Sequence, residues 1–194
     1  MGNAGARLPI ARGRPPALRA PRLPARHLLL LVPLQPAARE VPDGLPDGDI
    51  LETLSAQRAA VLQTLSAIPS DKHQYRYAPD KWSVMEMLRH VIDTEWVFSF
   101  RALWIARADQ SPLPDMDQAA FVANTDVSNQ RLDEWIEEFA DLRSANLRLF
   151  GSFDEEVFSR IGTSSGNRTT VRALVWISAG HVAHHLDILR DRYL

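Results

Sequence analysis

Four segments of the chain repeat apolar side chains at intervals of three and four residues, and this helical period constrains the fold more than any other feature. The segments cover residues 49–68, 83–110, about 129–150 and about 170–193. Breakers such as Pro69, Pro112 and Gly151 separate them. No segment shows the sustained two-residue alternation of a half-buried β-strand. We therefore predict an all-α fold in which the four helices pack as a four-helix bundle.

The second helix is expected to begin at a capping box. The Ser83 hydroxyl can accept a hydrogen bond from the backbone of Glu86, and the Glu86 carboxylate can bind the backbone of Ser83 in return. A proline-rich connection at residues 111–125 follows this helix, and a loop rich in turn-forming residues at 162–167 precedes the last one. The connection carries Phe121 and could cover a site or pack against another subunit.

The first 40 residues differ in composition from the rest of the chain. Residues 1–39 contain seven arginines and no acidic residue, with prolines throughout. Because proline at this density blocks helices and sheet ladders, we expect residues 1–40 to be a disordered extension and residues 46–194 to form the folded domain. The apolar run at 28–32 is far too short to span a bilayer. The expected location is the cytoplasm, with a transit or export signal as the alternative reading of the Arg-rich segment.

Composition also limits the chemistry. Beyond residue 39 the chain carries 15 basic and 24 acidic residues, a net charge of −9, which argues against nucleic-acid binding. The chain contains no cysteine, which excludes a disulfide framework, a thiolate zinc site and a cysteine nucleophile. Histidine must therefore carry any metal chemistry that needs a nitrogen or sulfur ligand.

The fourth segment holds two histidines at a helical spacing. His181 and His185 are four residues apart, which on an α-helix places their rings about 40° apart and one turn from each other. His185 lies in the middle of the apolar stripe and His181 at its edge, whereas His184 leans toward the rim. Two such imidazoles can bind one divalent transition-metal ion if a third ligand comes from elsewhere. The alternative is an ordinary hydrogen-bonded pair of core or surface histidines.

Two other histidines of the folded part could supply that third ligand. His90 lies on a flank of the second helix that can face a neighbouring helix, whereas His73 lies in a connection between charged residues and is expected to be solvated. Asp93 and Glu95 flank the His90 face, and Glu86 lies one turn before it. Asp93 and Glu95 are candidates for proton transfer or for orienting a ligand, and a role as surface charges is the alternative for each.

Several chemistries are excluded by these motifs. A zincin protease needs a glutamate directly after the first histidine of the pair, but this position is Val182. A di-iron bundle needs two Glu-x-x-His pairs, and no glutamate precedes a histidine of residues 46–194 by three positions. Trp96, Trp104 and Trp176 could form the wall of a pocket, with bundle packing as the alternative.

Several short motifs of the folded part resemble those of the DinB-like superfamily, which includes the YfiT-type metal-dependent hydrolases. The motifs are residues 77–84 (YAPDKWSV), 90–95 (HVIDTE), 101–103 (RAL), 112–114 (PLP), 117–118 (DQ) and 180–186 (GHVAHHL). The most specific are the Lys-Trp-Ser helix start, with a histidine eight residues after the tryptophan, and the C-terminal His-x3-His. The resemblance covers about residues 46–194. It implies an up-down-down-up four-helix bundle in which His90, His181 and His185 bind one divalent ion, commonly zinc, nickel or iron. Together with the apolar helix surfaces, it also leads us to expect a homodimer.

The resemblance also implies two kinds of reaction. Three neutral imidazoles leave the full charge on the ion, which could activate water for hydrolysis. The ion could instead bind a low-molecular-weight thiol, as in the superfamily's thiol-dependent S-transferases and a mycothiol-dependent isomerase. A metal-dependent hydrolase or S-transferase acting on a small molecule is therefore one hypothesis. A non-catalytic, stress-related metal-binding or interaction protein is the other.

Overall fold

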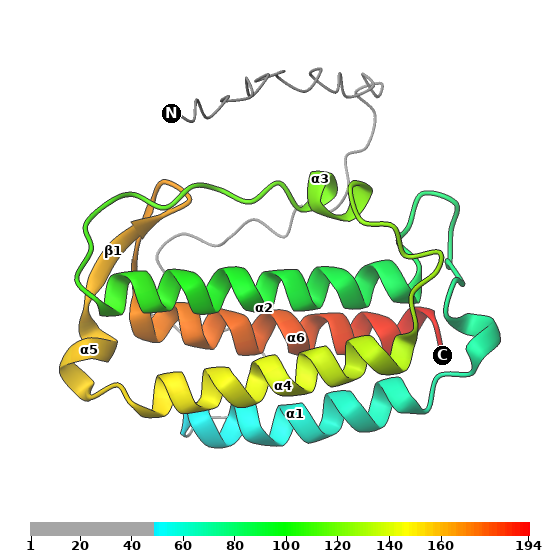
Figure 1. Cartoon of the computed structure of the whole chain (residues 1–194), viewed down its shortest axis with the longest axis horizontal. Coiled ribbons are helices and arrows are strands. Elements are labelled where there is room, and N and C mark those ends of the chain that lie inside the picture. The colour runs from blue at the N-terminus through cyan, green and yellow to red at the C-terminus, as the bar shows by residue number, and fades with distance from the viewer. Residues whose placement is uncertain (1–48) are drawn as a thin grey trace, which may run out of the picture. The chain divides into compact units, whose positions relative to one another are not determined.

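The computed structural model describes residues 49–194, and the expected extension at residues 1–40 lies outside this range. Four long helices dominate the fold: α1 (Ile50–Ser66), α2 (Val84–Ala106), α4 (Leu132–Gly151) and α6 (Val171–Arg192). The shorter elements are η1 (Ser70–Lys72), α3 (Gln118–Ala123), α5 (Glu155–Ser159), β1 (Ile161–Ser164) and β2 (Asn167–Thr170). The predicted all-α class and four-helix bundle are confirmed (Figure 1). Within the described range, no helix has the length and apolar character needed to cross a membrane.

The long helices follow the up-down-down-up order. Helices α1 and α6 run in one direction, and α2 and α4 run in the other (Figure 1). Helix α2 packs against α6 and α4, and α1 completes the bundle by packing against the same two helices. Because α2 and α4 are parallel neighbours, the chain must return along the whole bundle between them. Residues 107–131 make this return and contain the short helix α3.

Side-chain caps set the starts of three long helices. The capping box predicted for α2 is confirmed: the Ser83 hydroxyl accepts from the Glu86 amide at 3.2 Å, and the Glu86 carboxylate accepts from the Ser83 amide at 2.7 Å. Asp49 caps α1, and Thr170 caps α6 by accepting from the backbone of the third helical residue. Arg131 occupies the N-cap position of α4, so this helix begins at Leu132, three residues after the expected start near residue 129.

The loop predicted at residues 162–167 is part of a β-hairpin in the structure. Strands β1 and β2 are antiparallel and pair Ile161 with Thr170 at one end and Ser164 with Asn167 at the other. Ser165 and Gly166 form the two-residue turn, both with positive φ, as tight hairpin turns require. Four-residue strands are too short to show a readable alternation, so the sequence revealed only the turn.

The return segment is attached to both the hairpin and α2. The Leu113 amide donates to the carbonyl of Thr163, and the Leu113 carbonyl accepts from the amide of Ser165. The Arg101 side chain on α2 donates to the carbonyl of Pro114 at 2.8 Å. Phe121 in α3 is 45% exposed. That this segment covers a site or meets another subunit stays a prediction.

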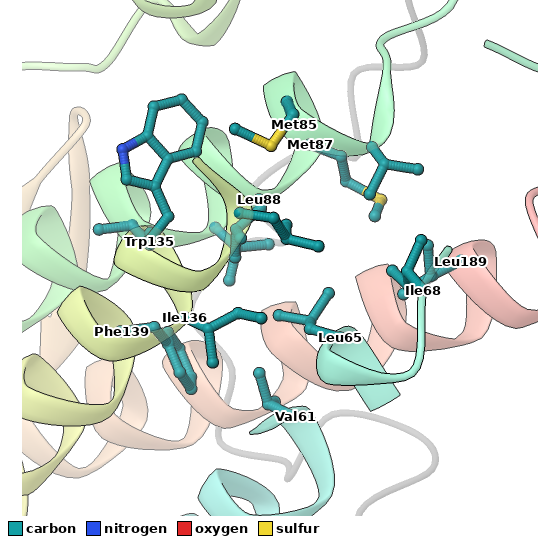
Figure 2. Packing of buried hydrophobic residues seen from close by; sticks show 14 of the residues in the cluster. Val61, Leu65, Ile68, Met85, Met87, Leu88, Trp135, Ile136, Phe139 and Leu189 are labelled. Carbon is teal, nitrogen blue, oxygen red and sulfur yellow. The ribbon is translucent and has the colours of Figure 1, made fainter. Parts of the chain in front are cut away.

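Apolar side chains form two clusters along the bundle. The first lies at the end where α2 begins and includes Leu88, Phe139 and Leu189 (Figure 2). The second surrounds Phe98 and Phe150 toward the other end. On α2, α4 and α6 the first cluster gives way to the second near the middle of the helix, and buried polar side chains lie in that middle part.

We expect Ser83→Ala to destabilise the fold by about 1 kcal/mol, because it removes the buried N-cap hydroxyl and leaves the half-buried Glu86 amide of α2 without its partner. Urea denaturation followed by circular dichroism measures the change. Ser66→Ala, which alters an exposed serine at the end of α1, is the control and should leave the midpoint unchanged. Equal midpoints for the Ser83 variant and the wild type would contradict the assignment.

Candidate metal centre

Three histidines from two helices converge in the bundle. His90 comes from α2, and His181 and His185 come from α6. The Nε2 atom of His181 lies 3.0 Å from Nε2 of His90 and 3.2 Å from Nε2 of His185. The ring centroids of His90 and His185 are 4.9 Å apart. The structure thus brings together all three residues that the resemblance named as metal ligands.

The antiparallel packing of α2 and α6 creates this convergence. His181 and His185 are one helical turn apart on α6, so both rings face α2. His90 is the seventh residue of α2, at the end of its second turn, and is 1% exposed. Trp82 packs its ring 4.8 Å from that of His90, just before the capping box. Trp82 was not predicted to lie at the site, although its position eight residues before His90, about two helical turns, was a usable signal.

A threonine sets the orientation and tautomer of the central ring. Thr94 lies one turn after His90, and its hydroxyl donates to the His90 carbonyl at 2.8 Å. The same oxygen is 3.2 Å from Nδ1 of His181. Because the hydroxyl proton is already used, the oxygen accepts from Nδ1–H of His181. Nε2 of His181 is therefore left with its lone pair directed at the other two rings.

Burial keeps all three rings neutral. Desolvation lowers the pKa of His90 to about 4. Desolvation, followed by the proximity of His90 and His184, lowers the pKa of His181 to about 3. The pKa of His185 is held well below its usual value, mainly by burial and then by His181. At neutral pH the rings therefore offer lone pairs rather than positive charge.

The arrangement of the three imidazoles is explained better by a shared metal ion than by hydrogen bonds between the rings. One lone pair on Nε2 of His181 cannot accept from both neighbouring rings. Nδ1 of His90 and Nδ1 of His185 are buried and have no hydrogen-bond partner within residues 49–194. Zinc–nitrogen bonds of about 2.0–2.1 Å in a tetrahedral site place two ligand nitrogens roughly 3.3 Å apart. The observed 3.0 and 3.2 Å are close to this separation.

The remaining histidines lie outside the cluster. His184 is exposed, with its ring 5.4 Å from that of His185, in agreement with the rim position expected from the helical wheel. His73, expected to be solvated, is half-buried and its Nε2 lies 3.3 Å from the carbonyl of Ile68. This contact closes the turn after α1, which sequence spacing does not reveal.

The three tryptophans proposed as a pocket wall do not gather at the histidines. Trp96 is 54% exposed, the ring of Trp104 is tilted against that of Phe100 with centroids 5.4 Å apart, and Trp176 is buried in the second apolar cluster. His185 instead borders a cavity of about 20 Å³ whose other lining side chains are apolar residues of α1, α2 and α6. Ordinary helix packing therefore accounts for Trp176.

The two candidate carboxylates are engaged elsewhere. Asp93 is half-buried and paired with Arg89 at 2.8 Å. Burial raises the pKa of Asp93, and the nearby Arg89 counteracts this. Glu95 is 2% exposed and paired with Arg143 at 2.8 Å. Neither carboxylate hydrogen-bonds to the three rings within the described part of the chain, so a role in proton transfer stays a prediction for both.

A sequence comparison agrees with the fold and with the position of the histidines. The sequence profile of the DinB superfamily matches residues 53–189, which include all three rings. The chain belongs to the DinB superfamily. A comparison with curated protein sequences found no match.

Several solved structures share the fold at low sequence identity. One is YfiT from Bacillus subtilis, described as a probable metal-dependent hydrolase with an unusual four-helix bundle topology; it matches with a TM-score of 0.62 and 18% identity, over 73% of this chain and 85% of YfiT. A DinB-like protein from Bacillus subtilis matches with a TM-score of 0.53 and 17% identity, over 75% of this chain and 90% of that protein. The mycothiol-dependent maleylpyruvate isomerase matches with a TM-score of 0.57 and 14% identity, over 71% of this chain but only 58% of the isomerase.

The metal-free protein should lose stability as the pH falls from 7.5 to about 5.5. Unfolded histidines take up protons near pH 6.5, whereas the buried rings, with pKa values of about 4 and 3 for His90 and His181, do not. Each ring that stays neutral therefore costs about 1 kcal/mol of stability at pH 5.5. Urea denaturation at several pH values, with a chelator present, measures the slope.

The variant His90→Gln serves as the control for this titration. The slope of the unfolding free energy against pH should be smaller in this variant, by the equivalent of about one proton, because the unfolded chain has one histidine fewer to protonate. If the free energy of unfolding does not change between pH 7.5 and 5.5, the three rings take up protons in the folded protein as readily as in the unfolded chain, and the expected lowering of their pKa values is wrong.

Proposed function

We propose that His90, His181 and His185 bind one divalent transition-metal ion, and that the protein is a metal-dependent enzyme acting on a small molecule. The convergence of three Nε2 atoms, with neighbouring separations of 3.0 and 3.2 Å, is the observation that supports this proposal. Three imidazoles suit zinc, nickel or iron. The description of YfiT as a probable metal-dependent hydrolase favours hydrolysis as the reaction.

When bound, the ion would supply Lewis-acid chemistry, lowering the pKa of a coordinated water or thiol and so providing a nucleophile near neutral pH. The protein's own residues prepare this chemistry. The Thr94 hydroxyl holds the His181 ring with its Nε2 lone pair toward the site. Trp82 and Phe98 pack beside the rings of His90 and His181 and limit the access of water.

Thiol transfer is the second candidate reaction. The mycothiol-dependent isomerase with a similar fold acts with a thiol, and this chain has no cysteine of its own to provide the sulfur. A low-molecular-weight thiol would therefore enter as a cosubstrate at the same three histidines. The nucleophile is water in the first reaction and a thiol in the second, and both reactions use the same three histidines as metal ligands.

The metal proposal predicts that purified protein carries about one ion per chain and that His90→Ala loses it. Removing one of three ligands should weaken the affinity roughly 100-fold or more, beyond the effect of removing an outer contact. Elemental analysis and metal titration measure both quantities. The variant His73→Ala removes a histidine outside the cluster and should retain the ion. Equal occupancy in the His90 and His73 variants would remove His90 from the site.

The reaction proposal predicts turnover that depends on the metal. Protein loaded with zinc, nickel or iron should hydrolyse activated esters or amides, or should conjugate a small thiol to an electrophile, and chelation should abolish the activity. Hydrolysis without added thiol supports the first reaction, and strict thiol dependence supports the second. Absence of both, with ligand substitutions that alter stability alone, would identify the protein as a non-catalytic metal-binding or interaction protein.

A further inference from the structure

A buried polar network crosses the middle of the bundle. The carboxylate of Glu95 on α2 accepts four hydrogen bonds from three side chains. On Oε1 it accepts from Arg143 Nε at 2.8 Å and from Asn146 Nδ2 at 2.8 Å. On Oε2 it accepts from Arg143 Nη2 at 2.9 Å and from the Ser178 hydroxyl at 2.6 Å. Glu95 is 2% exposed and Arg143 is fully buried.

The network reaches all four long helices. Arg143 and Asn146 belong to α4, and Ser178 belongs to α6. Gln57 on α1 accepts from Arg143 Nη1 at 2.9 Å and donates to the carbonyl of Ala179 on α6 at 2.8 Å. The carboxylate of Glu95 therefore lies at the centre of contacts that fix α2 relative to every other long helix.

This arrangement is poorly explained by stability alone. Burying an ion pair costs desolvation free energy that its attraction offsets only when the geometry is very good, and apolar replacements are often as stable. Apolar contacts are also non-directional and tolerate small shifts between helices. Four directed hydrogen bonds on one carboxylate do not tolerate such shifts. The network therefore specifies one register between the helices.

The network fixes the alignment of α2 with α6 that brings His90 close to His181. Glu95 directly follows Thr94, which bonds to His181, and Ser178 lies one turn before His181. The bond between Ser178 and Glu95 therefore joins α2 to α6 beside the three rings. A slide of one residue along the helix axis, about 1.5 Å, would separate Nε2 of His90 from that of His181.

We propose that Glu95 is a positioning residue for the three-histidine site: held by Arg143 and Asn146, its carboxylate binds Ser178 and so aligns α6 with His90. This inference rests on the proposed metal site. Glu95 acts through the helix positions and does not touch the metal or a substrate.

The test compares two buried serines. Ser178→Ala removes the hydroxyl that joins α6 to Glu95. Ser99→Ala removes a hydroxyl of similar burial that bonds only the backbone of its own helix, through the carbonyls of Glu95 and Trp96. Both variants lose one hydroxyl, so thermal unfolding reports any general loss of stability. Cobalt(II) and zinc(II) are the probes, read by titration and by the visible spectrum of the cobalt protein.

We expect Ser178→Ala to bind zinc about tenfold or more weakly and to change the cobalt spectrum, while Ser99→Ala keeps the wild-type affinity and spectrum. A crystal structure of metal-free Ser178→Ala should show His90 and His181 Nε2 atoms farther apart than the 3.0 Å of the wild type. This last readout needs no metal and no activity.

Other outcomes would overturn the inference. If the wild type binds metal and Ser178→Ala matches it in affinity and spectrum, Glu95 does not position the site, and the proposed metal site stands. If Ser99→Ala loses as much affinity as Ser178→Ala, the effect is a general one and the positioning role is wrong. If the wild type binds neither cobalt nor zinc, the proposed metal function fails, and this inference fails with it.

Discussion

The antiparallel contact between α2 and α6 is the interaction on which the rest of the structure depends. These two helices share more packing contacts than any other pair of elements in the described residues. The pairing contributes buried side chains to both apolar clusters. It also brings His90 to His181 and His185 and joins Glu95 to Ser178. In a bundle of the same helices in which α2 and α6 were not neighbours, His90 would lie away from His181 and His185 and the three rings would share no common centre.

The bundle alternates apolar and polar layers, and each layer has a distinct physical task. The apolar clusters supply most of the favourable free energy, because burial of apolar area is the largest favourable term in folding. They do not by themselves specify a register. The Glu95–Arg143 pair and its partners supply directed bonds in the middle of the bundle. The three histidines converge only when the helices are aligned in this way. Their burial lowers the pKa values of His90 and His181, so the lone pairs of these rings remain available at neutral pH.

The fold could be predicted from sequence because its main signals are local. The helical period, the capping box at Ser83 and Glu86 and the glycine at 151 are all readable within a few residues, and the structure places the long helices at those positions. The short hairpin was missed because its strands have only four residues each. The buried network was missed for another reason. Arg143 is charged and lies four residues after an apolar core position, and sequence alone does not show that a carboxylate on another helix neutralises it.

The sequence by itself determined the approximate extents of the four long helices, their apolar faces and the spacing of His181 and His185, because these depend on the pattern along a single helix. The exact ends differ by up to four residues, since α2 stops at Ala106 and the predicted segment continues to residue 110. Only the tertiary structure decided that Nε2 of His90 lies 3.0 Å from Nε2 of His181, that Glu95 faces Arg143 and Ser178, and that Trp176 belongs to the core. The physical reason is that these contacts join residues more than 40 positions apart. Their geometry follows from the relative rotation and shift of whole helices, which many buried contacts set together and no local pattern encodes.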